Sequence, residues 1–423
     1  MMFLGYNNPM RQMIINLMAR YLSWCARRVI NRADRKTPII GITGSTGKTS
    51  TKEMMGLIAK ESIGAGVIVA PGNLNNEVGL PLAILGFTEV PNLWQYIAIK
   101  FQALWRAFFM NPASGYVLEY GIDHPGDMDF LLSIVRPSVA VLTNITPVHL
   151  EYFASKEDLV NEKAKLGSAA NEYVIINGDD KNLATINFGN RKVLKFGRDA
   201  GSDLQLKNYN LNEIHTDFTV SYGKKEMAFT IAALGEQHIM SAMPAILFGL
   251  INNLGEEQIR AALLSYKPMP GRGNIIKGKN SSIIINETYN ANPLSVEKAL
   301  DVLGKMKGSP KIAVLGDMLE LGSESHSEHQ RILELAKEQA DLVFTVGPRM
   351  KEAGGGEKSF EDPNSAAQYL YDRVERDSVM LVKGSQGMRM EFIVKKLMQD
   401  PSLAEKELPR QGRQWLKTPF KPI

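Results

Sequence analysis

A short glycine-rich loop between an apolar segment and a helix-forming segment constrains the fold of this chain most. Residues 37–42 read TPIIGI, residues 43–49 read TGSTGKT, and residues 50–60 have helix-forming character. Small residues let backbone N–H groups close around phosphate oxygens, and the start of a helix adds a positive dipole. We therefore predict a nucleotide-phosphate site formed by Thr43, Gly44, Ser45, Thr46, Gly47, Lys48 and Thr49.

Two residues of this loop have predicted chemical roles. Lys48 would neutralise the β- and γ-phosphates, and the Thr49 hydroxyl would bind Mg²⁺. Ile42 stands where the standard motif has its first glycine, so a glycine turn with an unrelated lysine is the alternative. The strand–loop–helix order favours the phosphate site. Kinases, ATPases and ligases share such loops, so the reaction has to be inferred from the rest of the chain.

The pattern along the chain predicts an α/β protein. Apolar strands are expected at residues 116–121, 138–145 and 173–178, and an antiparallel β addition at 190–233. After the proline-glycine segment 267–274, further strands are expected at 282–286, 311–317, 342–347 and 379–385. We predict a central ATP-binding domain with a P-loop and a mostly parallel sheet (38–270), a carboxy-terminal Rossmann-like domain (271–423) and an amino-terminal helical segment (1–37).

Composition limits the partners, the redox compartment and the membrane spans that can be expected of this protein. The net charge of +4 gives no reason to expect a nucleic-acid partner. Cys25 is the sole cysteine, which excludes an intrachain disulfide and fits a reducing compartment. No stretch reaches the ~20 consecutive apolar residues of a membrane span, and arginines interrupt the apolar amino-terminal run. We expect a cytoplasmic monomer that acts on small molecules.

Two segments have the spacing of amphipathic helices. Residues 9–32 place apolar side chains on one side and arginines on the other. Residues 92–110 repeat Trp94, Ile97, Phe101, Leu104, Trp105 and Phe108 at helical spacing, interrupted by Lys100 and Arg106. Packing of the two helices against each other is the favoured interpretation. Peripheral contact with a membrane is the alternative.

Five segments resemble the Mur ligase family along residues 38–400. They are TGSTGKTS (43–50), GNLNNEVGLPLAIL (72–85), ETYNANPLSVEKAL (287–300), GDMLELGSESHSEH (316–329) and VKGSQGMRME (382–391). The last four resemble the branch that adds D-alanyl-D-alanine. The resemblance implies an ATP-dependent, ADP-forming ligase that joins this dipeptide to a UDP-muramoyl-peptide carboxylate through an acyl phosphate, in peptidoglycan precursor synthesis. A Mur-like ligase with another acceptor or amine, and a non-catalytic nucleotide-binding partner, are the alternatives.

The resemblance also implies a catalytic and metal site. Glu119 and His149 match the family's Mg²⁺ ligands, and Lys163 matches the lysine that the family carbamylates into a further ligand. Together with Thr49 they are expected to bind two Mg²⁺ ions. Arg272 matches an arginine that reaches the phosphates from between the domains. Lys48, His149, Lys163 and Arg272 are thus the predicted catalytic residues. The alternatives are a strand-end carboxylate for Glu119, a structural histidine for His149, a solvated lysine for Lys163 and a turn arginine for Arg272.

The remaining predicted residues bind substrate or nucleotide. Asn290 is expected near the nucleotide, and the residues expected near the substrates are Asn75, Asn76, Asn292, Lys383, Gly384 and Ser385. Asx turns explain Asn290 and Asn292 equally well.

Three departures from the family pattern stand out. Residues 1–37 are too few for the family's amino-terminal UDP-binding domain, which leaves open how UDP is held. Ile239 and Ala242, after His238, replace asparagines common in the family, and Lys165 replaces a glutamate.

Overall fold

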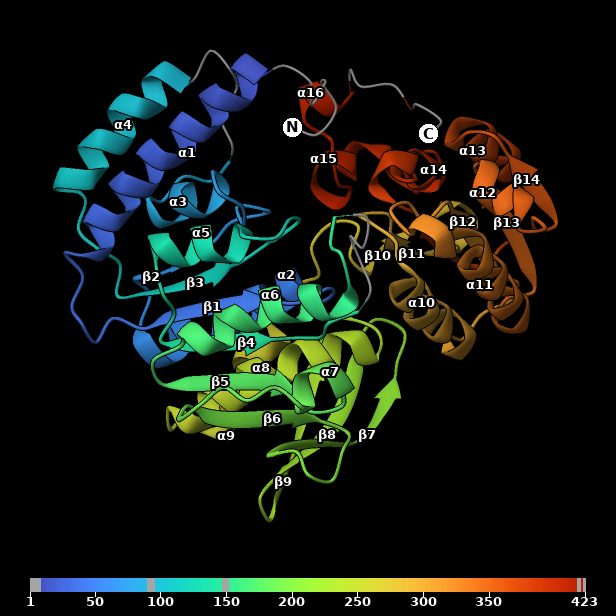
Figure 1. Cartoon of the computed structure of the whole chain (residues 1–423). Coiled ribbons are helices and arrows are strands. Elements are labelled where there is room, and N and C mark those ends of the chain that lie inside the picture. Colours follow the sequence, from blue (N-terminus) through green and yellow to red (C-terminus); the bar gives the residue numbers. More distant parts are fainter. Residues whose placement is uncertain (1–8, 90–95, 147–151, 417–419, 421–423) are drawn as a thin grey trace.

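Two α/β units, each built around its own sheet, lie side by side in the computed structural model (Figure 1). The structure describes residues 9–89, 96–146, 152–416 and 420. The α/β fold with mostly parallel sheets is confirmed.

The first sheet has nine strands among the described residues, in the order β2-β3-β1-β4-β5-β6-β7-β8-β9. Strands β2 to β7 pair in parallel with their neighbours, and β7, β8 and β9 form an antiparallel meander. The strands are β1 Ile39–Thr43, β2 Val67–Val69, β3 Gly115–Glu119, β4 Val139–Leu142, β5 Tyr173–Asn177, β6 Lys192–Gly197, β7 Leu204–Leu211, β8 Thr216–Tyr222 and β9 Lys225–Ile231.

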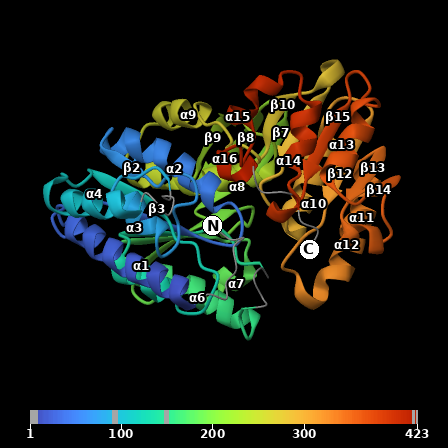
Figure 2. The ribbon, with the colours of Figure 1, turned by 90° about the horizontal axis from the view of Figure 1, so that it is seen from above.

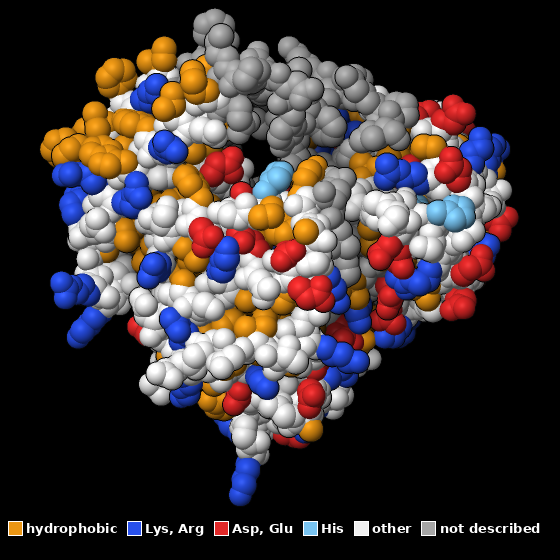
Figure 3. Space-filling model, in the orientation of Figure 1, with side chains coloured by type: hydrophobic (Ala, Val, Ile, Leu, Met, Phe, Trp, Pro, Cys, Tyr) orange, Lys and Arg blue, Asp and Glu red, His pale blue; other side chains and the backbone are white. Residues whose placement is uncertain are grey.

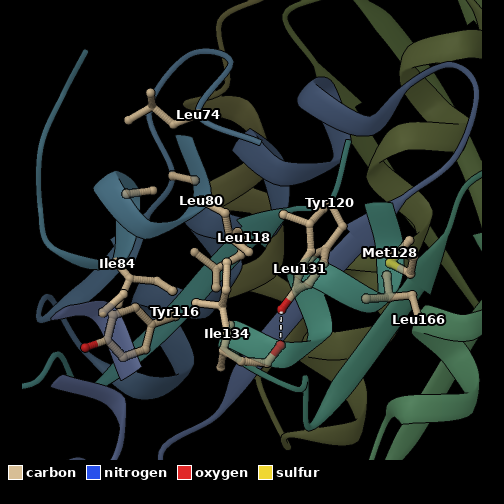
Figure 4. Close-up of a cluster of buried hydrophobic side chains, with 14 of the residues drawn as sticks. Leu74, Leu80, Ile84, Tyr116, Leu118, Tyr120, Met128, Leu131, Ile134 and Leu166 are labelled. Atoms are coloured by element: carbon tan, nitrogen blue, oxygen red, sulfur yellow. Dashed lines mark hydrogen bonds between the residues drawn. The ribbon is translucent and has the colours of Figure 1, made fainter. Parts of the chain in front are cut away.

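Helices cover both faces of this sheet. Tyr116 and Leu118 of β3 point into one core, shared with α1, α3 and α5, whereas Val117 points into the other, shared with α2, α8 and α9 (Figure 4). This alternation follows from the two-residue period of a strand. The helices are α1 Pro9–Ile30, α2 Lys48–Ile63, α3 Gly79–Ile84, α4 Tyr96–Phe109, α5 Asp127–Ile134, α6 Lys156–Ala169, α7 Lys181–Ala184, α8 Glu236–Ile251 and α9 Glu256–Leu264.

The second sheet has the order β10-β11-β15-β12-β13-β14, with only the β10–β11 pair antiparallel. Its strands are β10 Asn274–Lys277, β11 Ile283–Glu287, β12 Lys311–Gly316, β13 Leu342–Val346, β14 Lys358–Phe360 and β15 Val379–Lys383. Its helices are α10 Pro293–Lys305, α11 Ser325–Gln339, α12 Pro348–Glu352, α13 Pro363–Tyr371, α14 Glu391–Leu397, α15 Ala404–Glu407 and α16 Arg413–Leu416. Helices α10 and α11 pack on one face, and α13 and α14 on the other.

The two amphipathic segments form α1 and α4, which lie side by side at one edge of the first unit (Figures 1 and 2). Leu22 and Val29 of α1 and Ile99 and Ala103 of α4 are buried in the same core. The predicted packing of the two helices is therefore confirmed for their inner faces. Trp94 lies outside the described residues.

One prediction about the sheet is wrong in part. The segment 190–233 was expected to form an antiparallel β addition; β7, β8 and β9 do so, but β6 pairs in parallel with β5, and β7 pairs in parallel with β6. Alternation of polar and apolar residues indicates a half-exposed strand and does not determine the direction of its neighbour. Among the helices that the structure describes, none is both long and apolar enough to cross a membrane.

Candidate active site

The phosphate loop leaves the end of β1 and enters α2, as the sequence predicts. Gly47 has φ +78° and precedes the first helical residue, and a Cβ on Gly44, at φ +150°, would collide with Thr143 Oγ1. Thr46 N–H donates to Asn144 Oδ1 at 2.9 Å, and Ser45 N–H donates to the Asn144 carbonyl at 2.8 Å. The loop is thus held in shape from the end of β4, with the N-terminus of a sixteen-residue helix behind it.

Lys48 folds back over the loop. Its Nζ donates to the carbonyl oxygens of Gly44 at 2.8 Å and Ser45 at 3.2 Å. Burial lowers the pKa of Lys48, the nearby Glu119 opposes this effect, and Arg272 adds to it. A phosphate oxygen placed at the loop would offer this ammonium group an anionic partner in place of two carbonyls.

Glu119, the last residue of β3, is a buried carboxylate with several partners. Its Oε2 accepts from Thr49 Oγ1 at 3.1 Å, and its Oε1 accepts from Asn75 Nδ2 at 3.0 Å. Burial raises the pKa of Glu119, but the cations of Lys52 and Lys48 outweigh burial, so the net pKa is lowered. The group is therefore an anion beside the phosphate loop.

Lys52 was not predicted as a site residue. It is fully buried on α2, its Nζ donates to the Gly72 carbonyl at 2.7 Å, and it lies 3.7 Å from Glu119 Oε2. Its position four residues after Lys48 places both lysines on one side of the helix, and this spacing was the available signal. Lys52 keeps Glu119 charged in a buried setting.

Lys163 reaches the same loop from α6. Its side chain is buried, and its Nζ donates to the Gly44 carbonyl at 3.2 Å, the oxygen that Lys48 also contacts. Burial and then the Lys48 cation lower the pKa of Lys163 to about 7. Two amines from distant segments thus converge on one oxygen, and one of them is readily deprotonated.

Lys165, two residues later, lies on another side of α6. Its Nζ forms ion pairs with Asp129 and Glu162, both at 2.6 Å. Glu162 in turn accepts the backbone N–H groups of Gly126 and Met128. Lys165 therefore ties α6 to α5 and does not contact the loop.

The predicted metal ligands are only partly assembled in the described part of the chain. The Glu119 carboxylate and the Thr49 hydroxyl are adjacent oxygen donors, which is the chemistry Mg²⁺ prefers. His149 lies outside the described residues. Across the described ranges there is no group of three or more His, Cys, Asp or Glu side chains that could hold a metal. Lys163 would add an anionic oxygen only after chemical modification.

Arg272 lies where the two units meet. Its guanidinium carbon is 4.0 Å from the centre of the Tyr289 ring, and its charge lowers the pKa of both Lys48 and Glu119. Asn73 Nδ2, from the first unit, donates to the Tyr289 hydroxyl of the second. Arg272 is therefore close enough for its charge to act on Lys48 and Glu119, and the Tyr289 ring against which it lies also makes a contact between the units.

The predicted substrate residues of the second unit cluster at the ends of β11 and β15. Lys383 Nζ is buried and contacts Glu287 Oε2 and the Asn290 carbonyl, each at 3.0 Å. Ser385 Oγ accepts Leu319 N–H at 2.8 Å and donates to the Ala291 carbonyl at 3.3 Å. Gly384 leaves no room for a side chain beside Met390.

The asparagines divide into two groups. Asn75 contacts Glu119, as given above, and Asn290 Oδ1 accepts Gln386 N–H at 3.2 Å. Asn76 accepts Gly79 N–H at 2.8 Å at the start of α3, and Asn292 accepts Ser295 N–H at 2.9 Å as the N-cap of α10. The Asx alternative thus describes the present contact of Asn292, and a substrate role for it stays a prediction.

The positions after His238 belong to the core. Ile239 and Ala242 are fully buried on α8 and pack in the core beneath the sheet. Apolar residues there contribute to packing, so any contact with an adenine ring has to come from other side chains.

Comparison with known proteins adds independent information. Residues 42–249 match the Mur ligase middle domain, and residues 271–386 match the Mur ligase glutamate ligase domain. A UDP-N-acetylmuramoyl-tripeptide–D-alanyl-D-alanine ligase of Bacillus subtilis (strain 168) is 30% identical over 385 residues, covering 86% of this chain and 77% of that protein. Its namesake from Escherichia coli (strain K12) is 29% identical over 375 residues, with the same coverage.

Solved structures give the same picture. A crystal structure of MurF from Acinetobacter baumannii is similar with a TM-score of 0.75 and 25% identity, covering 90% of this chain and 80% of that one. A MurF ligase from Thermotoga maritima in complex with ADP has a TM-score of 0.75 and 26% identity, covering 89% of this chain and 83% of that one.

Proposed function

The chain belongs to the Mur ligase family, and we propose that it is the ATP-dependent ligase that adds D-alanyl-D-alanine to a UDP-muramoyl-peptide. The observation that carries this proposal is the convergence of Lys48 and Lys163 on the Gly44 carbonyl, with the Glu119 carboxylate bonded to Thr49 beside them. An ammonium group for the phosphates, an amine of lowered pKa and a carboxylate beside one loop are groups that phosphoryl transfer would use. Relatives named for this reaction, one of them solved with ADP, support the choice.

The reaction has two steps. An oxygen of the substrate carboxylate attacks the γ-phosphorus of ATP, the bond from this phosphorus to the bridging oxygen breaks, and ADP leaves. The amino group of D-alanyl-D-alanine then attacks the carbonyl carbon of the acyl phosphate. The tetrahedral intermediate collapses with loss of phosphate and a proton, which leaves an amide bond.

The central unit would supply the first step. Backbone N–H groups of the loop and the Lys48 ammonium bind the phosphates, and Arg272 faces the same charge from the second unit. Such preorganised donors stabilise the charge that develops on the transferred phosphoryl group. Asn144 fixes the loop and the Tyr289 ring lies against Arg272, so both are positioned in advance, whereas Lys48 would exchange its carbonyl partners for phosphate when the nucleotide binds.

Thr49, Glu119, His149 and a carbamylated Lys163 would hold Mg²⁺. When bound, the metal neutralises negative charge on the β- and γ-phosphates. The lowered pKa of Lys163 supports its role, since the neutral amine is the form that reacts with CO₂. Carbamylation replaces a cation with a carboxylate-like oxygen donor.

The second unit would present the amine. Lys383, Gly384, Ser385 and Asn292 lie at strand and helix ends of this unit, while Asn75 and Asn76 lie on the first unit. We place the domain boundary between residues 270 and 271, with residues 1–37 as a separate helical segment. Closure of the two domains, in a monomer, would bring the amine to the acyl phosphate.

Phosphate release tests the function. The protein is supplied with ATP, Mg²⁺, UDP-muramoyl-tripeptide and D-alanyl-D-alanine, and each substrate is omitted in turn. We expect phosphate only with the complete set, together with a product whose mass equals the tripeptide substrate plus the dipeptide minus water. Full phosphate release with another acceptor or amine, and none with this pair, would refute the proposal.

A further inference from the structure

The outer sides of α1 and α4 are apolar although both helices already bury their inner sides. Several large apolar side chains are exposed there, and six of them define what we name the α1–α4 face: Leu17, Trp24, Ile97, Phe101, Trp105 and Phe109. Phe101 is 70% exposed and Trp105 60%. The space-filling view shows apolar side chains gathered at this edge of the molecule (Figure 3). A contiguous apolar surface of this kind marks an interaction site.

The charges on these helices have one sign. Neither α1 nor α4 contains Asp or Glu. Among the side chains described on the two helices, the exposed charged ones are Arg20, Arg27, Arg28 and Lys100. The Arg28 guanidinium lies 4.2 Å from the centre of the Phe108 ring and 5.6 Å from that of Trp24. Aromatic and basic groups therefore share one surface.

Polar contacts at the inner edge fix the helix pair to the protein. Tyr21 OH donates to the Lys100 carbonyl at 2.7 Å, and Arg32 donates to the carbonyls of Phe108 at 3.0 Å and Met110 at 2.8 Å. Arg106 donates to the Leu85 carbonyl at 2.6 Å. The helices keep their place through these bonds and their buried sides, so the α1–α4 face is available to a partner.

We propose that the α1–α4 face binds the surface of an anionic lipid bilayer. A helix with aromatic side chains and basic residues lies in the membrane interface, its rings at the level of the headgroups and its cations on anionic lipids. Long Arg and Lys side chains reach the headgroups while their stems cover apolar surface. The contact is peripheral, because none of the described helices could cross the bilayer.

A second copy of the chain fits the same face poorly. Pairing two such faces would bring Arg20, Arg27, Arg28 and Lys100 of both copies together without an acidic residue from either α1 or α4. Like charges at an interface oppose association. An anionic bilayer provides both the apolar phase and the counter-charge.

Vesicle flotation of the full chain tests the proposal. Vesicles of phosphatidylglycerol and phosphatidylcholine are compared with phosphatidylcholine alone, at low and high salt. We expect binding to the anionic vesicles that weakens with salt. Phe101→Ser with Trp105→Ser should lower the partition coefficient at least about tenfold, because two aromatic rings that the bilayer would bury are lost. Arg20→Gln with Lys100→Gln should lower it roughly tenfold on anionic vesicles only.

Matched controls lie elsewhere on the molecule. Leu264→Ser removes an apolar side chain that is 57% exposed on α9, and Lys224→Gln removes an exposed charge between β8 and β9. Both should bind like the unaltered protein. All variants should keep the same far-ultraviolet circular dichroism, and brominated lipids should quench the tryptophan fluorescence of the unaltered protein. No flotation and no quenching, or self-association that the Phe101→Ser and Trp105→Ser substitutions abolish, would overturn the proposal.

Discussion

Two lysines, one in each unit, are equally buried but have different partners. Lys383, at the end of β15, is 2% exposed and has the Glu287 carboxylate 3.0 Å from its Nζ. Lys163, on α6, is also 2% exposed, but its Nζ contacts the Gly44 carbonyl and lies under the influence of the Lys48 cation. One charge is balanced by an anion in contact with it, and the other faces a neutral oxygen.

This difference in contact partners distinguishes a lysine whose charge is held by an ion pair from a lysine that can react as an amine. Burying a charge is costly unless an opposite charge and hydrogen bonds compensate. Lys383 has that compensation, so it contributes to the fold around Glu287. For Lys163, the charges of Asp123 and Glu162 only partly oppose burial and the Lys48 cation, and its pKa falls to about 7. An amine near neutrality is available for chemistry that a paired ammonium cannot undergo.

The largest effect is expected at the reactive lysine. Lys163→Ala should lower kcat on the order of 10²- to 10³-fold, because a group beside the transferred phosphoryl is removed. Stability should hold or rise, since a buried charge that is only partly compensated is lost. Steady-state phosphate release and urea unfolding measure the two quantities. Full activity in this variant would show that the metal site does not include residue 163.

Removal of the anionic partner of Lys383 should lower stability, in contrast to the effect expected for Lys163→Ala. Glu287→Gln leaves the buried Lys383 cation without its anion and should lower the free energy of unfolding by about 3 kcal/mol. The double variant Lys383→Met, Glu287→Leu should recover much of this loss, because the pair is replaced by apolar groups. Urea denaturation provides the measurement. A single variant as stable as the unaltered protein would show that the pair is not structural.

Reactivation by CO₂ should follow the pKa of Lys163. With a pKa of about 7, the neutral fraction falls roughly tenfold from pH 8 to pH 6. Enzyme stripped of CO₂ is therefore expected to regain activity about ten times more slowly at pH 6 than at pH 8, at one fixed concentration of dissolved CO₂. All samples are assayed at a single pH after incubation. A rate independent of pH would contradict the assignment.

The lowered pKa of Lys163 also determines the direction in which the free energy of unfolding changes with pH in CO₂-free buffer. The pKa in the folded state lies below its ordinary value of 10.5, so the unfolded chain binds more protons between about pH 7 and pH 10.5. Through Lys163, the free energy of unfolding should thus rise with pH in this window and be flat below it. The Lys163→Met variant should lack this contribution, which urea unfolding at several pH values would reveal.

The smallest effect is expected at Lys165. This lysine is 37% exposed, and Glu162, the buried one of its two anionic partners, keeps two backbone N–H donors. Lys165→Ala should therefore change stability by less than about 1 kcal/mol and kcat by no more than about threefold. Steady-state phosphate release and urea unfolding measure these two effects. A larger loss of activity here than in Lys163→Ala would reverse the roles of the two positions.

Local patterns allowed much of the site to be predicted. The loop 43–49, the strand that ends at Glu119 and the helix that carries Lys163 are all found, because phosphate loops and apolar strands have short-range signatures. Their roles in catalysis remain predictions. Contacts over long separations were missed: Lys52 to Gly72, and Asn144 to the loop, depend on how strands are ordered in the sheet.

A local pattern can have two structural meanings. Asn292 fits substrate binding and an Asx turn alike; in this structure its side chain caps α10, and its substrate role stays a prediction. The alternation in residues 190–233 fits either direction of pairing, and β6 takes the parallel one. Only the neighbours in space decide between the meanings.

The resting position of Lys48 bears on how the enzyme would complete a cycle. Its ammonium is already satisfied by the Gly44 and Ser45 carbonyls, so an arriving nucleotide displaces an internal ligand and does not fill an empty site. The departing ADP is replaced by those same carbonyls. The loop would thus behave as an exchange partner, and the free energy of the internal bonds that the nucleotide breaks would be subtracted from its binding free energy.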